Sequence, residues 1–250
     1  MCIRDSSIAF WRLVIASFVL IIAVLFFSRK SLNADLFRKD SWRILILGGL
    51  LGLHFILFAS AVLDTTIINA TVLVNTTPIW SMLVSSIVFK LRPTRLAAFG
   101  IALSIAGVLA IGYADASSRI WTIQLRGDSE AILAAVVEAF YLNYGRETRR
   151  RMPLMPLMLV IYIVSAVTVF TIGAVAGIGF TSPSEPSLVL TLIGLGILPT
   201  ALAHSLYFSS LSNLKSFETA TMALLEPVGA TLIGWAILLE VPDAFFVLGA

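Results

Sequence analysis

Residues 43–62 read RILILGGLLGLHFILFASAV, an apolar run whose charged residue, Arg43, stands at its first position. A helix rises about 1.5 Å per residue, so a run of this length crosses the roughly 30 Å hydrocarbon core of a bilayer. The run is too long for the roughly ten-residue strands of a membrane barrel, and a helix satisfies its own backbone groups in lipid. The stretch therefore predicts a transmembrane helix.

The rest of the chain has the same apolar character. Of its 250 residues, 59% are hydrophobic and 12% are charged, whereas a soluble domain carries about 25% charged residues. The mean hydropathy is +0.99. This composition excludes a soluble enzyme, a disordered chain and a nucleic-acid-binding protein. Cys2 is the single cysteine, which excludes a disulfide framework and a multi-thiolate metal site. We expect no cofactor and no metal.

Apolar runs bounded by charged or turn residues predict eight transmembrane helices and the start of a ninth. They cover residues 7–28, 43–62, 67–89, 96–113, 129–145, 154–179, 187–210 and 217–239, and the ninth begins near residue 242. The longest connections, near 29–42 and 114–128, are too short for a soluble domain. The sequence thus predicts an all-α polytopic membrane protein surrounded by lipid.

Basic residues predict how the helices are oriented. Three loops and one short turn are basic and fall on the same side when the spans alternate; they hold Arg29, Lys30, Arg38, Lys39, Arg43, Lys90, Arg92, Arg95, Arg146, Arg149, Arg150, Arg151 and Lys215. The opposite side receives Arg119 and Arg126 together with several acidic residues. Because cytoplasmic loops are enriched in lysine and arginine, we expect the basic side to be cytoplasmic. We expect a multi-pass protein of the cell membrane, most simply a bacterial inner membrane.

The chain contains an internal repeat. An offset of 149 residues aligns 48–100 with 197–249 without a gap. The aligned pairs include Pro78 with Pro227, Pro93 with Pro242, and Gly100 with Gly249. The loop with Lys90 corresponds to a segment with Glu240, so equivalent loops carry opposite charge. This pattern predicts two halves inserted in opposite orientations, with a substrate site near the midplane between them.

Short motifs recur along the chain in a fixed order. They are Phe10-Trp11-Arg12 at the start of a span, Asn75-Thr76-Thr77-Pro78 in the first half, Leu225-Glu226-Pro227-Val228 in the second half, and Glu240. In this order and spacing the chain resembles the EamA-like branch of the drug/metabolite transporter superfamily. That family has ten helices in two inverted five-helix repeats, and its glutamate after the fourth helix falls here at Leu91.

The resemblance implies two repeats of a ten-helix transporter fold. The first repeat is expected at 7–113, without the family's first helix, and the second at 127–250, with a truncated last helix. Residues 1–6 belong to no pattern, and we interpret them as a non-native leader.

Glu226 is the leading candidate for a substrate-binding residue, because an ionisable side chain at the membrane centre costs about 2.5–3.5 kcal/mol. It precedes Pro227, whose missing N–H and bulky ring kink a helix. Pro78 is the corresponding kink in the first half, and Asn75 and Thr71 lie one turn apart near it. These side chains either line a common cavity or join helices through hydrogen bonds.

Four more polar side chains within spans are candidates for lining a cavity. Arg12 either reaches the membrane surface or pairs with a substrate carboxylate or with Glu138. Glu138 and Tyr141 share one helix face, and we expect Glu138 to face inward. His204, with its near-equivalent His54, is either a packed histidine or a cavity residue.

The motifs of enzymes and of ATP-driven pumps are missing from the sequence, including a P-loop and a nucleophile elbow. We therefore expect a secondary-active transporter, an exporter of a small polar metabolite that is amino-acid-like or drug-like, and not an enzyme. Protons or another ion are the expected coupling species, and a homodimer is left open. The alternative is a non-transporting membrane fragment or assembly subunit.

Overall fold

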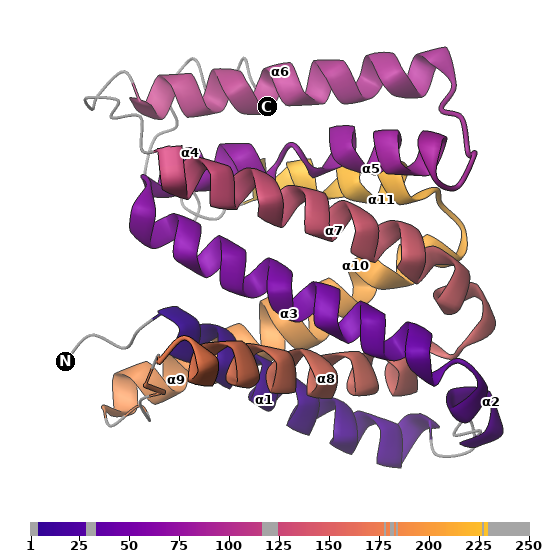
Figure 1. The fold of residues 1–250 in the computed structure, drawn as a ribbon, viewed down its shortest axis with the longest axis vertical. Helices are drawn as coiled ribbons and strands as arrows, with labels where there is room; N and C mark the ends of the chain where they lie inside the picture. The colour runs from indigo at the N-terminus through magenta and orange to yellow at the C-terminus, as the bar shows by residue number, and fades with distance from the viewer. Residues whose placement is uncertain are drawn as a thin grey trace. The chain divides into compact units, whose positions relative to one another are not determined.

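The computed structural model describes residues 5–28, 34–116, 125–177, 179–180, 183, 185–226 and 228–229. Every regular element in these residues is a helix (Figure 1). The chain divides into two compact units, each made from two stretches that are distant in sequence. Unit 1 comprises Met1–Ser60 and Tyr144–Asn213, and unit 2 comprises Ala61–Asn143 and Leu214–Ala250.

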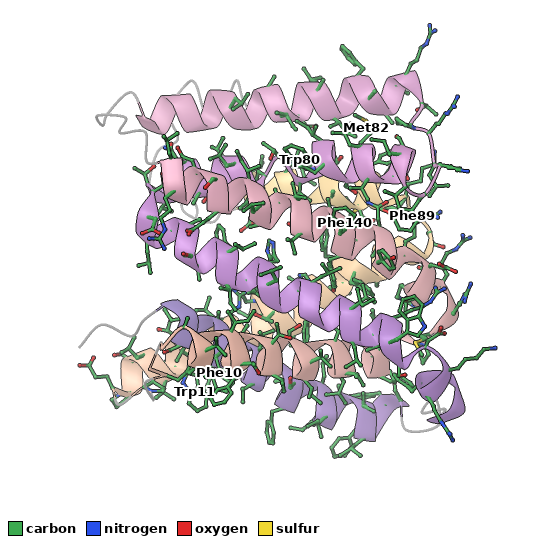
Figure 2. The ribbon with its side chains drawn as sticks, in the orientation of Figure 1. Phe10, Trp11, Trp80, Met82, Phe89 and Phe140 are labelled. Atoms are coloured by element: carbon green, nitrogen blue, oxygen red, sulfur yellow. The ribbon has the colours of Figure 1, made fainter. Side chains whose placement is uncertain are left out.

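Unit 1 is built around an antiparallel pair of helices, α1 and α8. Its elements are α1 (Asp5–Ala23), the π-helix η1 (Val24–Ser28), α2 (Ala34–Lys39), most of α3 (Ser41–Asp64), the end of α7, α8 (Leu154–Val175), α9 (Pro186–Leu195), the π-helix η3 (Gly196–His204), α10 (Ser205–Ser209) and the 3₁₀-helix η4 (Ser210–Ser212). The end of η1 meets the start of α8, where Ser28 Oγ lies 3.3 Å from Met155 Sδ. The start of α1 meets the other end of α8, where Phe10 packs against Phe170 (Figure 2).

Two glycines allow α3 to approach α8 closely in unit 1. A Cβ atom on Gly48 would lie 2.4 Å from Cβ of Val164, and one on Gly52 would lie 2.8 Å from Cβ of Thr168. The Ser165 hydroxyl lies 2.9 Å from the Gly48 carbonyl oxygen. Small residues of this spacing are typical of close helix packing in membranes, where helices associate through van der Waals contact.

Unit 2 contains the helices that carry most of the candidate residues. Its elements are α4 (Ile67–Val74), α5 (Thr77–Ile87), α6 (Arg95–Ala116), α7 (Leu125–Arg151) up to Asn143, α11 (Ser216–Met222) and the 3₁₀-helix η5 (Ala223–Leu225). Helix α11 packs on α5, and α6 packs on α4. The buried face of α5 carries Thr77, Ser81 and Ser85, so the interior of this unit is polar along one helix.

The sequence predicts a single helix at 67–89, but in the structure this span is interrupted. Helix α4 ends at Val74 and α5 begins at Thr77, immediately before Pro78. Pro78 has no N–H to donate to the carbonyl four residues earlier, which belongs to Val74. The Thr77 hydroxyl donates to that carbonyl instead, at 2.7 Å. The Trp80 indole donates to Oγ1 of Thr76 at 3.1 Å (Figure 2), which closes the turn between the helices.

Five helical stretches in the described residues are long and apolar enough to span a membrane. They are Ser7–Ser28, Ser41–Asp64, Asn69–Ile87, Leu154–Val175 and Pro186–Ser212, and a shorter apolar stretch covers Arg95–Gly107. These stretches coincide closely with six of the predicted spans. The prediction of an all-α polytopic membrane protein is thus confirmed. The ninth helix, most of the span expected at 217–239, Pro227 and Glu240 lie outside the described residues.

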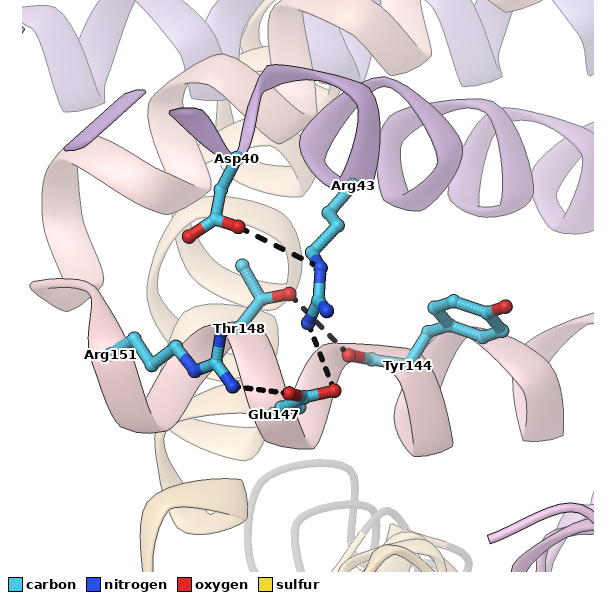
Figure 3. Close-up of polar contacts among 6 residues, drawn as sticks. All are labelled: Asp40, Arg43, Tyr144, Glu147, Thr148 and Arg151. Atoms are coloured by element: carbon cyan, nitrogen blue, oxygen red, sulfur yellow. Dashed lines mark hydrogen bonds and ion pairs between the residues drawn. The ribbon is translucent and has the colours of Figure 1, made fainter. Parts of the chain in front are cut away.

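Charged residues gather at the ends of the helices. In unit 1, Arg43 at the start of α3 binds Glu147 near the end of α7, with Nη1 and Oε2 2.9 Å apart (Figure 3). Glu147 also pairs with Arg151, and Arg43 lies 3.6 Å from Asp40. Two basic loops of the predicted cytoplasmic side therefore meet at one end of unit 1.

The end of unit 2 where α7 begins carries a second set of ion pairs and hydrogen bonds. Arg126 Nε lies 3.0 Å from Oδ2 of Asp64, and the Thr65 hydroxyl donates to Asp128 at 2.7 Å. Gly127 approaches the backbone at Asp64 so closely that a Cβ atom would lie 2.5 Å from its carbonyl carbon. This end thus contains the acidic residues that the sequence assigns to the non-cytoplasmic side.

Candidate functional site

Arg12 contacts buried residues of unit 1. Its Nε–H donates to Oγ1 of Thr200 at 2.9 Å, and Thr200 is fully buried. Its guanidinium carbon lies 4.7 Å from the centre of the Phe55 ring, within the range of a cation–π interaction. Whether Arg12 reaches the membrane surface or pairs with a substrate carboxylate stays a prediction.

The partner of Arg12 lies in a π-helix. Helix η3 contains Pro199, and its π-helical turns pair N–H groups with carbonyls five residues earlier. The Thr200 hydroxyl donates to the Leu195 carbonyl at 2.8 Å, while its oxygen accepts from Arg12. The Thr200 carbonyl in turn accepts from the buried Tyr162 hydroxyl at 2.6 Å. The irregular backbone thus presents polar groups to the interior of unit 1, as π-helical turns at functional sites often do.

His204 belongs to the same group of side chains. Its ring lies 6.4 Å from that of Phe55, 6.1 Å from that of Tyr162 and 5.9 Å from that of Tyr207. His54, the second histidine, stacks on Phe58 at 6.5 Å. We call Arg12, Phe55, Tyr162, Thr200 and His204 the Arg12 cluster. It combines a cation, hydroxyl groups and aromatic rings, which together suit a small anionic or zwitterionic ligand.

Glu138 is a charged candidate residue in unit 2. Its Oε2 lies 3.0 Å from the Thr77 hydroxyl oxygen at the start of α5, and its side chain is half-buried. Tyr141, one turn further along α7, is fully buried. Arg12 and Glu138 belong to different units, so a pairing between them stays a prediction.

The remaining candidates of unit 2 lie at or beyond helix ends. Asn75 is the C-cap residue that follows α4, and its N–H donates to the Thr71 carbonyl at 2.9 Å. Both side chains are half-buried, and Pro78 is buried. Glu226 follows η5 with an exposed side chain. A common cavity for Asn75, Thr71 and Glu226 stays a prediction.

Sequence reasoning missed Thr200, Tyr162 and Phe55. The available signal was Pro199 in the middle of a span with a threonine beside it, the same pair of residue types as Thr77 and Pro78. In both places the threonine hydroxyl donates to a backbone carbonyl of the preceding turn. Among the described residues, no group of three or more histidine, cysteine, aspartate or glutamate side chains could hold a metal ion.

Outside the spans, partial burial lowers the pKa of Arg149 below its ordinary value, because desolvation disfavours the charged form. Its Nη1 donates to the Met152 carbonyl at 2.9 Å, which ties the end of α7 to the turn before α8.

Comparison with known proteins agrees with this architecture. A model of the EamA-like transporter family matches residues 3–113 and 125–250. An uncharacterized transporter of Archaeoglobus fulgidus is 27% identical over 243 residues, which cover 97% of this chain and 83% of that protein.

A solved crystal structure of a protein shares the fold. It superposes with a TM-score of 0.79 at 19% identity, covering 99% of this chain and 84% of the other. At this identity the likeness concerns the fold alone. The family model, in contrast, covers nearly the whole sequence, so the resemblance seen in the motifs is confirmed. This chain belongs to the EamA-like transporter family.

Proposed function

We propose that this membrane transporter is secondary-active and exports a small polar metabolite, amino-acid-like or drug-like, by alternating access around a site between its two repeats. Its membership in a transporter family and its apolar helices make it a multi-pass membrane protein that handles a small molecule. Export, coupling to protons or another ion, and residence in a bacterial inner membrane belong to the proposal.

The Arg12 cluster is the observation that carries the substrate class. An arginine inside a span is costly unless it meets polar partners, and Arg12 meets Thr200 and the Phe55 ring. A guanidinium binds a carboxylate through two parallel N–H groups, with a geometry that lysine does not offer. We expect the terminal nitrogens of Arg12 to bind the substrate carboxylate while Nε stays on Thr200.

The packing of unit 1 supports the proposed inverted repeat. The offset of 149 residues that relates the two halves brings α1 onto α8. These two helices pack against each other and run in opposite directions. An antiparallel pair of equivalent helices is expected when two halves insert in opposite orientations.

The proposal is tested by export from cells that express the complete gene, with a panel of amino-acid-like metabolites and their methyl esters. We expect export of a free carboxylate and rejection of its ester, and loss of this preference in Arg12→Gln. Arg12→Lys keeps the charge but loses the two parallel N–H groups of the guanidinium, so we expect weaker export with a raised KM. Export that ignores the ester in wild-type protein would contradict the carboxylate assignment.

A chain that inserts but moves no compound of the panel would favour the alternative, a non-transporting fragment or assembly subunit. Gly49→Ala is a suitable control variant, because a Cβ atom at Gly49 meets nothing within 4 Å. It should export like wild type.

A further inference from the structure

We infer that Glu138 is the carboxyl that carries the coupling proton, and that the proton reaches it along the seam between α5 and α7 from the basic end of unit 2. The inference rests on the proposed function, since it names the coupling ion and its route. It begins at Thr77, whose hydroxyl oxygen lies 2.7 Å from the Val74 carbonyl and 3.0 Å from Oε2 of Glu138.

Thr77 has one hydroxyl hydrogen for these two oxygen atoms. Because Pro78 has no N–H, the Val74 carbonyl depends on the Thr77 hydroxyl, which is also closer to it than to Glu138. With that hydrogen on Val74, a hydrogen bond between Thr77 and Glu138 requires a hydrogen from the carboxyl group. The contact is therefore complete when Glu138 is protonated.

Thr200 in unit 1 has a similar arrangement. There the group next to the hydroxyl oxygen is Nε–H of Arg12, which always carries a hydrogen to donate. The Thr200 hydroxyl donates to the carbonyl of Leu195, and its oxygen accepts from Nε–H of Arg12. Glu138 has the same relation to Thr77 that Arg12 has to Thr200. A carboxyl group in that position must carry a hydrogen to donate.

A buried polar stripe leads away from this contact along α5. Thr77, Ser81 and Ser85 follow one another at intervals of about one helical turn, so the stripe extends about 12 Å along the axis. Asn143 of α7 joins it, because its Nδ2 lies 3.2 Å from the Ser81 carbonyl and 3.1 Å from the Ser81 hydroxyl. The two helices are thus joined by polar contacts at Glu138 and again at Asn143.

Two oxygen atoms on this seam have no hydrogen-bond partner in the part of the chain that the structure describes. They are Oγ of Ser85 and Oδ1 of Asn143, whose residues are 0% and 3% exposed. Oγ of Ser216 is a third such atom, on α11, which packs on α5. Buried polar atoms in native proteins are bonded to protein or to water. We expect water to enter the seam and bind these oxygen atoms.

The seam ends near the basic loop of unit 2. Ser85 lies in the last turn of α5, and its carbonyl accepts from the Leu91 N–H at 2.9 Å, beside Lys90 and Arg92. A proton from the aqueous phase at this end would pass along waters held by Ser85 and Asn143 and end on Oε2 of Glu138. Release of substrate or reorientation of the repeats then returns the proton to water, which leaves Glu138 ionised.

Charged and titratable groups are distributed unevenly over the elements of unit 2. Helices α4 and α5 carry none within their bounds, so the side of Glu138 that faces Thr77 meets no charge from them. The others in the described part of unit 2 are Asp64 at the end of α3, Lys90 and Arg92 between α5 and α6, Arg95, Tyr113 and Asp115 on α6, Arg126, Asp128, Glu130 and Tyr141 on α7, Lys215 and Glu218 at the start of α11, and Glu226 after η5. The Glu218 carboxylate accepts a hydrogen bond from the Lys215 N–H at 2.8 Å, at the start of α11.

The test measures protonation of Glu138 without any substrate. Dicyclohexylcarbodiimide modifies protonated carboxyl groups in apolar surroundings, and mass spectrometry of the full chain in membrane vesicles locates the modified residue. With the pH of the two sides set separately, we expect modification of Glu138 that follows the pH of the basic-loop side. Modification confined to Glu226, or a response to the opposite side alone, would overturn the inference.

Two neighbouring serines provide a matched pair of variants. Ser85→Val fills the place of the unpartnered hydroxyl and should abolish the response of Glu138 to pH on the basic side. Ser86→Val is the control, because the Ser86 hydroxyl donates to the Met82 carbonyl at 2.7 Å and takes no part in the seam. Equal responses in the two variants would rule out this route. Since no transport is measured, failure here is distinguishable from failure of the proposed exporter.

Discussion

The Thr200 hydroxyl makes two hydrogen bonds: it donates to the Leu195 carbonyl and accepts from Nε–H of Arg12. Thr200→Val keeps the shape of the side chain and removes both hydrogen bonds. A buried group left without its partner costs about 1–3 kcal/mol, so we expect lower thermal stability in detergent. Thr200→Ser keeps the hydroxyl and should unfold close to wild type. If the valine variant were as stable as the serine variant, Thr200 would not be holding Arg12.

At the scale of single residues, the sequence identifies charges more readily than their partners. Arg12 and Glu138 stand out because a charge within a span is rare and costly. Their partners Thr200 and Thr77 do not stand out, since threonine is common in membrane helices and its hydrogen bonds depend on tertiary contact. A proline next to the threonine is the signal that distinguishes these two, because it disturbs the backbone hydrogen bonding of the helix.

At the scale of helices, close packing of α3 on α8 gives a prediction with an internal control. A Cβ atom at Gly48 would lie 2.4 Å from Cβ of Val164, so Gly48→Ala must displace α8. Such overpacking costs about 1–3 kcal/mol. Gly49→Ala meets no atom within 4 Å and, as a better helix former, should be neutral or stabilising by up to about 1 kcal/mol. Thermal unfolding of both variants in detergent measures the difference; a Gly48→Ala variant no less stable than Gly49→Ala would show that the helices are not in close contact.

Helix positions follow from hydropathy, but helix interruptions do not. The spans predicted at 7–28 and 154–179 agree with the structure to within a few residues. The break at Asn75 and the π-helix around Pro199 depend on local hydrogen bonds, including those of the Thr77 and Thr200 hydroxyls. Proline is tolerated in membrane helices through several local adjustments, so its presence alone does not select among a kink, a break and a π-helix.

At the scale of the whole molecule, composition is enough to predict the class, because too few charged residues are present to solvate a globular surface. The division into units is not predictable in the same way. Each unit combines helices from both halves of the sequence. In unit 1, for example, α1 from the first half packs on α8 from the second half.

Orientation in the membrane can be tested separately for each unit, after Cys2 is replaced by serine. In unit 1 we expect a cysteine at Glu185 to react with an impermeant thiol reagent from outside intact cells, and a cysteine at Arg38 to be protected. In unit 2 the corresponding pair is Arg126, expected to react, and Arg92, expected to be protected. Glu185, Arg38 and Arg126 are exposed in the structure, so reactivity reports the side and not burial. The physical reason for the expected pattern is that short loops rich in arginine and lysine stay in the cytoplasm.

Permeabilised cells serve as the control, since all of the exposed cysteines should then react. The reverse pattern in both units would place the basic loops outside, and the proton of Glu138 would then have to arrive from the external side.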